Sequence, residues 1–277
     1  MDKEHRLEEH QQAPPVIHPI IEFPKDIERI PCLIVNAYLV GDPGENTDWI
    51  LVDTGLANSA DKIQEAAFHR FGDQHPKAII LTHGHFDHIG SLEELLDHWH
   101  VPVFAHELEL PYLTGQKDYP AADPTVGGGL MSLISPLYPH SRINLGKRIQ
   151  PLPQTGQVPF MDQWRWLATP GHSPGHISLW REQDRTLITG DAFITVEQES
   201  ALSVMSQNEE VHGPPKYFTT DWKAAEQSVK RLNELNPAFA YTGHGQPMKG
   251  QPLTQGLNHL ASQFQTLAVP DHGRYLH

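Results

Sequence analysis

Cysteine is almost absent from this sequence: Cys32 is the only one among 277 residues, so no disulfide bond can form within the chain. Long apolar runs are absent too, because no stretch approaches the ~18 residues that a membrane-spanning helix needs. The first residues, Met1 to Arg6, are too polar for the hydrophobic core of a secretion signal. These absences predict a cytoplasmic protein that does not bind a membrane, in which Cys32 packs as a small apolar residue.

Positive charge is scarce. The chain has 20 lysines and arginines against 34 aspartates and glutamates, which gives a formal net charge of −14, and it has no Lys/Arg-rich run. A nucleic-acid-binding surface is therefore not expected, because binding to phosphates depends on clustered basic side chains. The sequence also lacks a GxSxG motif, which argues against a serine nucleophile. The expected partner is a small-molecule substrate, and a monomer and a homodimer are both left open.

Histidine, by contrast, is abundant and clustered. Residues 82–88 read Thr-His-Gly-His-Phe-Asp-His and directly follow the apolar run 77–81. Imidazole nitrogens and carboxylate oxygens suit zinc and related divalent ions, and Gly84 gives the backbone freedom for a tight turn between two ligands. The apolar run is typical of a buried strand, and open α/β sheets bind ligands at the carboxyl ends of such strands. The segment therefore predicts a metal site that includes His83, His85, Asp87 and His88.

Three later segments repeat the pattern of an apolar strand, a glycine and a side chain that can bind a metal. Residues 164–168 precede Gly171-His172, residues 186–189 precede Gly190-Asp191, and residues 238–242 precede Gly243-His244. Because several strand ends can point toward one edge of a sheet, we expect His172, Asp191 and His244 at the same site. His176 lies where the next apolar strand begins, and it is predicted to form hydrogen bonds there and not to bind the metal.

In this order and spacing, the HxHxDH motif, the GH, the GD and the final GHG resemble the metallo-β-lactamase-fold hydrolase superfamily, in the branch shared by glyoxalase II and the acyl-homoserine lactonases. The resemblance extends from about residue 30 to about residue 250. It implies an α/β fold, a four-layer αβ/βα sandwich of two mixed β-sheets flanked by helices. It also implies two divalent metal ions as cofactors, with zinc as the first choice and iron or manganese also accommodated.

The same resemblance assigns the ligands. The residues that match the first metal site are His83, His85 and His172, those that match the second are Asp87, His88 and His244, and Asp191 would bridge both ions. The segment Val52-Asp53-Thr54-Gly55 matches a turn near the site, in which Asp53 would orient a ligand histidine.

These ligands imply metal-assisted hydrolysis. Two ions would share a hydroxide whose pKa falls toward ~7, so that a nucleophile forms at neutral pH and attacks a carbonyl carbon. The ions would hold the resulting oxyanion. Asp87 and Asp191 are the expected catalytic groups, which steer the hydroxide proton and deliver it to the leaving group. The expected substrate is a small, mostly apolar ester, lactone or thioester.

Two departures from the related enzymes bear on the substrate. After His244 the only basic side chains other than histidine are Lys249 and Arg274, whereas glyoxalase II-like enzymes grip glutathione with a basic C-terminal helical segment. Ile194 stands where the lactonases carry a tyrosine, three residues past the bridging aspartate. Both departures argue against the prediction that this protein acts on the same substrate as either of these related enzymes.

Two alternative functions stay open. The first is an oxidoreductase similar to the persulfide dioxygenases, with a single iron held by His83, His172 and Asp191. Iron at one ion per chain, with oxygen consumption, would support it, whereas two zinc ions would count against it. The second is a binding protein whose metal ions stabilise the fold without turnover of any ester.

Because both halves of the chain carry ligands, a single domain is expected over residues 16–277, behind a flexible N-terminal tail at residues 1–15. Apolar periodicity predicts strands over 33–40 and 49–52, and helices over 58–71, 91–99 and 221–235. Ser91 to Glu94 forms a capping-box pattern at the start of the second helix.

Two irregular stretches interrupt this alternation, near residues 107–147 and 193–219, with only a short apolar helix expected near 130–137. Long irregular segments in a compact domain are usually lids or binding loops, and each of these adjoins a ligand strand. They are predicted to be lid-like insertions that wall the substrate pocket, with Tyr112, Phe193 and Tyr217 as substrate-binding residues. Ordinary packing on the surface of the sandwich is the alternative.

Overall fold

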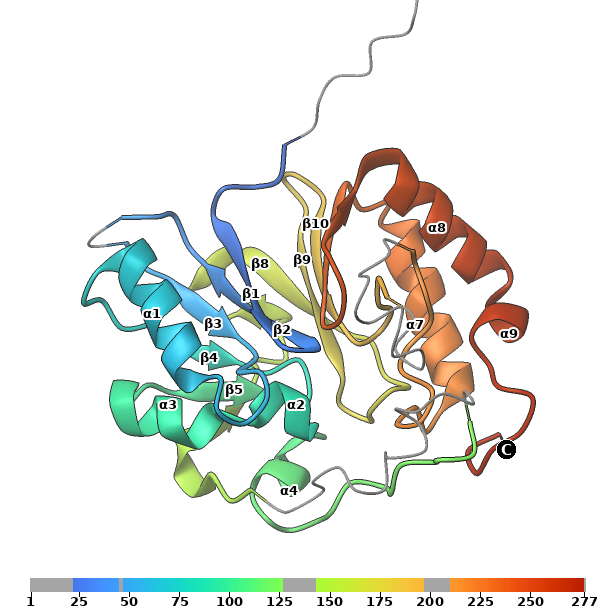
Figure 1. The fold of residues 1–277 in the computed structure, drawn as a ribbon, viewed down its shortest axis with the longest axis horizontal. Coiled ribbons are helices and arrows are strands. Elements are labelled where there is room, and N and C mark those ends of the chain that lie inside the picture. The colour runs from blue at the N-terminus through green and yellow to red at the C-terminus, as the bar shows by residue number, and fades with distance from the viewer. Residues whose placement is uncertain (1–21, 45–46, 127–142, 197–209, 277) are drawn as a thin grey trace, which may run out of the picture.

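The computed structural model describes residues 22–44, 47–126, 143–196 and 210–276. The expected tail at 1–15 and the expected short helix near 130–137 lie outside the described residues. Within the described ranges, the chain forms two six-stranded sheets with helices on both outer sides (Figure 1).

The first sheet comes from the N-terminal half of the chain, and its strands lie in sequence order. β1, β2 and β3 pair antiparallel, whereas β3, β4, β5 and β6 pair parallel, so the sheet is mixed. The strands are β1 (Ile27–Cys32), β2 (Val35–Val40), β3 (Ile50–Val52), β4 (Ile79–Ile80), β5 (Val103–Ala105) and β6 (Ile149–Pro151).

The second sheet comes from the C-terminal half, in the order β12-β11-β10-β9-β8-β7. It is also mixed, because β10 and β11 pair parallel while the other neighbours pair antiparallel. The strands are β7 (Gln157–Val158), β8 (Met161–Ala168), β9 (Ile177–Arg181), β10 (Thr186–Gly190), β11 (Phe239–Thr242) and β12 (Met248–Lys249).

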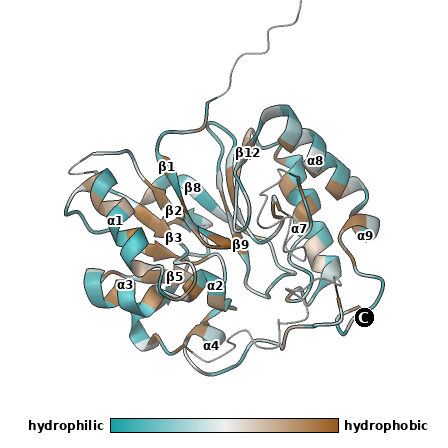
Figure 2. Ribbon diagram, in the orientation of Figure 1, coloured by the Kyte–Doolittle hydropathy of each residue, from teal (hydrophilic) through white to brown (hydrophobic). Residues whose placement is uncertain are grey.

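Helices cover the outer face of each sheet. Helices α1 (Ala60–Phe71) and α3 (Leu92–Trp99) pack on the first sheet, and α7 (Trp222–Glu234) and α8 (Gly250–Ser262) pack on the second. Figure 2 shows hydrophobic and hydrophilic residues mixed along α1, α3 and α8, as expected of helices that bury one face and expose the other. Shorter helical segments are α2 (Phe86–Ile89), α4 (Leu110–Leu113), α9 (Phe264–Leu267) and a 3₁₀ turn (Gly146–Arg148).

A third core lies between the two sheets and joins the halves of the chain. It includes Val52 and Ile80 from the first sheet, and Trp164, Leu179 and Ile188 from the second. Strands β2, β9 and β10 are buried at every position, because each has a packed layer on both faces. The resulting order of helix, sheet, sheet and helix confirms the αβ/βα sandwich predicted from the sequence.

The periodicity located the helices, but the one cap that the sequence predicted, at Ser91, is not formed by its side chain. Asp221 caps α7, where its side chain accepts a hydrogen bond from the backbone N–H of Ala224 at 2.9 Å. Ser91 does not cap α3 with its side chain. Its hydroxyl instead donates to the carbonyl of Leu56 at 2.7 Å and accepts from the N–H of Ser59 at 2.8 Å. The capping-box prediction was therefore wrong, because a contact distant in sequence uses the hydroxyl.

The predicted strand over 33–40 is in fact the second arm of a hairpin. Leu33 lies in the turn, with a φ of 66° and 85% of its surface exposed, and β2 begins at Val35. The first arm, β1, was not predicted, because Pro31 and charged residues interrupt its apolar pattern. Proline is tolerated there because β1 is an edge strand. Cys32 is buried at the end of β1 within the core, as predicted.

Among the helices that the structure describes, none combines the length and the apolar character needed to span a membrane.

Candidate metal centre

Strand ends from both sheets bring the metal-competent side chains to one place. From the first sheet, β4 leads to the motif His83 to His88, whose last two ligands lie in α2. From the second sheet, β8 leads to His172, β10 to Asp191 and β11 to His244. Each of these side chains follows a strand after a short turn, which is the pattern that the sequence indicated.

The structure brings together all seven residues that the sequence singled out as metal ligands, and all seven are buried. Their ligand atoms form three overlapping groups, with all atoms of a group within 4.8 Å of one another: His83, His85 and His172; His83, His88 and Asp191; and Asp87, His88 and His244. Oδ2 of Asp191 lies at the centre, 3.4 Å from Nε2 of His172, 3.5 Å from Nε2 of His88 and 3.2 Å from Nε2 of His244.

Several of these buried atoms have no protein partner that would satisfy them. Nε2 of His83, Nε2 of His88 and Oδ1 of Asp191 are buried without a hydrogen-bond partner among the described residues. Nδ1 of His85 and Nε2 of His172 face each other at 2.9 Å. Buried polar atoms rarely stay unsatisfied, and imidazole nitrogens with carboxylate oxygens are a common ligand set for divalent ions. The residues present therefore fit divalent metal ions.

Asp53 holds the orientation of one candidate ligand, His88. Its Oδ2 lies 2.8 Å from Nδ1 of His88 and accepts from the hydroxyl of Thr82 at 2.7 Å, while its Oδ1 accepts from the N–H of Thr82 at 2.8 Å. Because a carboxylate can only accept, His88 carries a proton on Nδ1, so Nε2 is the nitrogen that it directs toward the cluster. The sequence had placed Asp53 in this role by resemblance.

Two other candidate ligands, His244 and His172, are oriented in the same way. Nδ1 of His244 donates to the carbonyl of Ile34 at 2.7 Å, which leaves its Nε2 toward Asp191. Nδ1 of His172 lies 3.2 Å from the hydroxyl of Thr219, and that hydroxyl donates in turn to a backbone carbonyl. Both rings therefore present Nε2 to the cluster.

His176 is excluded from the ligand set by its own hydrogen bonds. Its Nε2 accepts from the backbone N–H of Asp191 at 2.8 Å, and its Nδ1 lies 3.1 Å from the carbonyl of Thr169. This is the hydrogen-bonding role expected from the sequence. It also accounts for Gly190, because a Cβ there would lie 2.6 Å from Nε2 of His176.

Burial and neighbouring charges set the protonation states of the cluster. Burial lowers the pKa of His85 to about 3, and burial together with the neighbouring histidines holds the pKa of His83 well below its ordinary value. Burial opposes ionisation of Asp191, but attraction from His244 and His88 brings its pKa well below the ordinary value. Neutral imidazole and ionised carboxylate are the forms that bind metal ions, so His83, His85 and Asp191 favour the metal-binding form at neutral pH.

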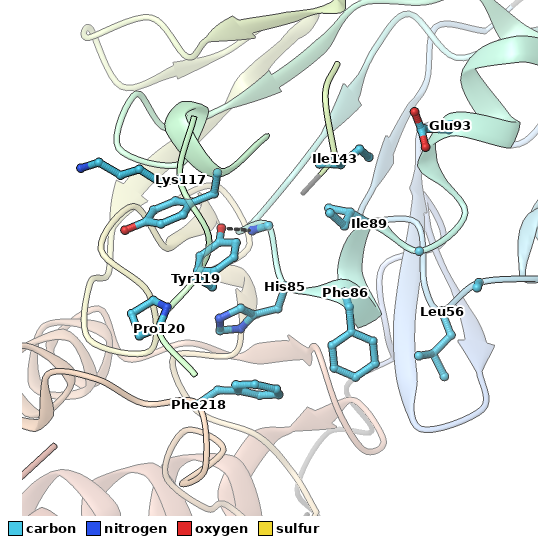
Figure 3. A pocket seen from close by; sticks show the side chains of 14 residues that line it. Leu56, His85, Phe86, Ile89, Glu93, Lys117, Tyr119, Pro120, Ile143 and Phe218 are labelled. Carbon is cyan, nitrogen blue, oxygen red and sulfur yellow. Dashed lines mark hydrogen bonds between the residues drawn. The ribbon is translucent and has the colours of Figure 1, made fainter. Parts of the chain in front are cut away.

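A cavity of about 530 Å³ opens beside the cluster. His85 belongs to its lining, so the cavity reaches a side chain of the candidate metal centre (Figure 3). Among the described residues that line it, Glu93 and Lys117 are the only charged side chains other than histidine. Apolar and aromatic residues make up most of the wall, including Leu56, Phe86, Ile89, Ile143 and Phe218. Pockets of this size and character are typical of small-molecule sites.

The three aromatic residues expected to bind substrate lie in different places. Tyr112 lines the cavity. Phe193 is fully buried in the core beneath α7 and α8 and is not part of the lining, and Tyr217 is buried beside Phe218. The described parts of both insertions nevertheless contribute to the wall, since the first supplies Tyr112, Lys117, Tyr119, Pro120 and Ile143, and the second supplies Phe218.

Two cavity residues were missed at the level of sequence. The rings of Tyr119 and Phe218 lie on either side of His85, with centroids 4.7 and 4.8 Å from its ring (Figure 3). Their positions within the two insertions were the only signal available. An irregular segment has no periodicity that distinguishes the aromatic residue facing a cavity from its neighbour.

Comparison with known proteins agrees with this geometry. The family model described as the metallo-beta-lactamase superfamily matches residues 30–244. The chain is 47% identical over 247 residues to the probable metallo-hydrolase YflN of Bacillus subtilis, covering 89% of this chain and 94% of that one. It is 33% identical over 226 residues to the probable metallo-hydrolase YybB of the same organism, covering 81% and 86%.

Solved structures show the same fold at lower identity. TTHA1623, in a di-iron-bound form, superposes with a TM-score of 0.58 at 24% identity, covering 86% of this chain and 98% of that one. ST1585 from Sulfolobus tokodaii gives a TM-score of 0.57 at 21% identity, covering 90% and 91%. With the family model matching most of the chain and the ligand residues gathered at one site, this protein belongs to the metallo-beta-lactamase superfamily.

Proposed function

We propose that this protein is a dinuclear metal-dependent hydrolase that cleaves a small ester, lactone or thioester. The observation that carries the proposal is the position of Asp191, whose Oδ2 lies within 3.5 Å of nitrogens from both groups of ligands. A carboxylate between two sets of histidines suits a pair of ions better than a single one. The names of the relatives YflN and YybB, both probable metallo-hydrolases, support the same reaction class.

In this proposal His83, His85 and His172 would hold one ion, Asp87, His88 and His244 would hold the other, and Asp191 would lie between them. Zinc is the first choice for these ligands, and iron and manganese are also compatible with them. When bound, such ions polarise a carbonyl oxygen and make hydroxide available as a nucleophile at neutral pH.

The two aspartates are the groups of this chain that can move protons at the site. Asp191 is ionised at neutral pH and can accept a hydrogen bond from the nucleophile. Burial raises the pKa of Asp87, so its carboxyl group holds a proton more readily than an exposed aspartate would. A carboxyl group with a raised pKa, close to the reacting atoms, can take a proton and deliver it to a leaving group.

The cavity supports a substrate with an uncharged, apolar group next to the scissile bond. An aromatic wall on both sides of His85 offers dispersion contacts to such a group. An anionic glutathione or carboxylate moiety would meet Glu93 as well as Lys117 in the same lining, so the lining offers no net positive charge to attract it. We therefore propose an apolar acyl or ring group as the part of the substrate that fills the cavity.

Metal analysis and turnover on the same protein test the proposal. Protein purified without added metal should contain close to two zinc, manganese or iron ions per chain, and it should hydrolyse some member of a panel of lactones, thioesters and aryl esters. His85→Ala and Asp191→Ala should each lose metal and activity, whereas His259→Ala, at an exposed histidine of α8, should retain both. A single iron with oxygen consumption and no hydrolysis would favour the dioxygenase-like alternative and overturn the proposal.

A further inference from the structure

A buried carboxylate outside the metal-ligand set links the two loops that carry the three histidines of one ion. Glu109 lies directly before α4 and is completely buried. Its Oε1 accepts hydrogen bonds from the hydroxyl of Ser173 at 2.7 Å and from the N–H of Gly175 at 2.8 Å. Its Oε2 accepts from the N–H of Gly84 at 3.0 Å and from the hydroxyl of Tyr119. Every one of these donors is a neutral group.

Three of these donors, Gly84, Ser173 and Gly175, belong to the loops that carry the histidines. Gly84 lies between His83 and His85 in the sequence, and Ser173 directly follows His172. Glu109 thus connects the first-sheet loop and the second-sheet loop at the point where their histidines converge. It is held by backbone N–H groups, so its position follows the positions of the loops themselves.

The loops are shaped to admit this carboxylate. A Cβ at position 175 would lie 2.7 Å from Cγ of Glu109, and a Cβ at position 84 would lie 2.5 Å from the hydroxyl oxygen of Tyr119. Any larger residue at either position would push Glu109 or Tyr119 away. Glycine at both places is therefore a condition for these hydrogen bonds.

Tyr119 extends the connection to the cavity wall. Its hydroxyl donates to Glu109. The same hydroxyl accepts from the N–H of Gly84 at 3.0 Å, the dashed line beside Tyr119 in Figure 3. Its ring lies against His85, lines the cavity and stacks on Tyr112 at a centroid distance of 4.1 Å. The hydroxyl of Tyr119 is therefore hydrogen-bonded within the protein, and the face of its ring is the part available to contact a ligand.

We propose that Glu109 is a positioning residue that holds His83, His85 and His172 at the spacing required to bind one metal ion, with Tyr119 as its link to the substrate cavity. The inference rests on the dinuclear site of the proposed function. It gives the first insertion a second role, because a residue of that insertion would position the metal-binding histidines in addition to the insertion lining the cavity.

Replacing Glu109 by glutamine distinguishes the proposed hydrogen-bonding role from a role in which the side chain only fills space. Each carboxylate oxygen of Glu109 accepts one backbone N–H, from Gly175 on one side and Gly84 on the other. An amide has a single oxygen, so its NH₂ group must face one of these two N–H donors whichever way it is turned. Glu109→Gln therefore preserves the volume and breaks the connection on one side.

The test is a cobalt(II) titration of metal-free protein, followed by its visible absorption and by competition with a chelator. Reference spectra come from His244→Ala, which keeps the three-histidine group, and His85→Ala, which keeps the other group. For Glu109→Gln we expect 10- to 100-fold weaker binding at the three-histidine group, the usual range for partners of metal ligands, and little change at the other. Glu107→Gln removes the same charge from an exposed position two residues away and should bind cobalt like the wild type.

Two milder variants keep the test decisive if Glu109→Gln does not fold. Ser173→Ala and Tyr119→Phe each remove one neutral donor, and each should weaken the same ion by about 2- to 10-fold. In the double variant Glu109→Gln/Tyr119→Phe the loss should be smaller than the product of the single losses, because both act through one contact.

Three results would overturn the proposal. Unchanged affinity at the three-histidine group in all these variants would show that Glu109 does not set its geometry. An equal loss at both groups, accompanied by a lower melting temperature of the metal-free protein, would assign Glu109 to general packing. A wild-type protein that binds no metal would overturn the proposed function and this inference together, whereas the first two results leave the proposed function intact.

Discussion

Replacing Asp53 by asparagine tests how the site controls the tautomer of His88. The carboxylate of Asp53 serves three donors with two oxygens, namely the N–H and the hydroxyl of Thr82 and Nδ1 of His88. Asparagine keeps the shape but has a single acceptor oxygen. If that oxygen stays with the N–H of Thr82, the NH₂ group faces Nδ1 of His88. The ring must then accept at Nδ1 and carry its proton on Nε2, the atom that should bind a metal.

The size of the effect follows from the hydrogen bond that the substitution removes. A hydrogen bond to a charged group is worth about 1.5–3 kcal/mol. At about 1.4 kcal/mol for each tenfold change, this corresponds to roughly 10- to 100-fold in affinity. The same range is usual when the partner of a metal-binding histidine is removed. The hydrogen-bond energy and the usual effect of such partners therefore give the same expected loss of metal affinity.

The assay is competition between the protein and a chelator for zinc, with the two dissociation constants measured separately. In Asp53→Asn the ion held by Asp87, His88 and His244 should bind 10- to 100-fold more weakly, while the ion at the three-histidine group should change little. Asp271→Asn, at an exposed aspartate, is the matched control. Unchanged affinity for both ions would refute the reasoning, as would a loss confined to the three-histidine group, which is the pattern expected for Glu109→Gln.

Three further predictions follow from the same geometry. Gly243→Ala should abolish metal binding, because a Cβ there would collide with Oδ1 of Asp191 and lie 3.0 Å from Cε1 of His88; metal analysis of the purified variant checks this, and a full complement of metal would contradict it. Phe218→Ala should lower kcat/KM for an ester with an apolar acyl group by roughly tenfold, because an aromatic wall is lost, and it should affect an acetyl ester much less; equal losses on both esters would count against an acyl cavity. Burial opposes charge on His88 and His244, but the neighbouring carboxylates raise the pKa of both above the ordinary value of about 6.5. As the pH falls, protons should therefore begin to displace the metal ions at a higher pH than they would from histidines with an ordinary pKa. Chelator competition across a range of pH measures the metal affinity. A metal affinity that stays constant below about pH 6 would contradict this prediction.

The cluster of side chains that can bind a metal and the helices could be predicted because their signals lie within a few residues. A strand, a glycine and a ligand occupy adjacent positions in each motif, and the structure gives the glycines a reason, since Gly190 adopts a φ of 52° and leaves room for His176. The stripe of Ala225, Val229 and Leu232 along α7 is equally local, with a period set by the helix itself.

Signals that involve distant partners could not be read from the sequence. The strand β1 is recognisable only from its pairing with β2, since Pro31 and its charged neighbours give no alternating pattern. Ser91 has the sequence of a cap, yet its hydroxyl bonds to Leu56, 35 residues away. In both cases a contact across the fold took precedence over the local preference.

The sequence by itself determined the class of chemistry, because the ability of histidine and aspartate to bind a metal is a property of the side chains and of the short turns that present them. Only the tertiary structure decided which other residues serve that site. Phe193 lies in the core under α7 and α8 while Phe218 faces the cavity, and Glu109 joins two loops that come from different sheets. Those assignments depend on packing between elements far apart in the chain, which a local pattern of residues does not encode.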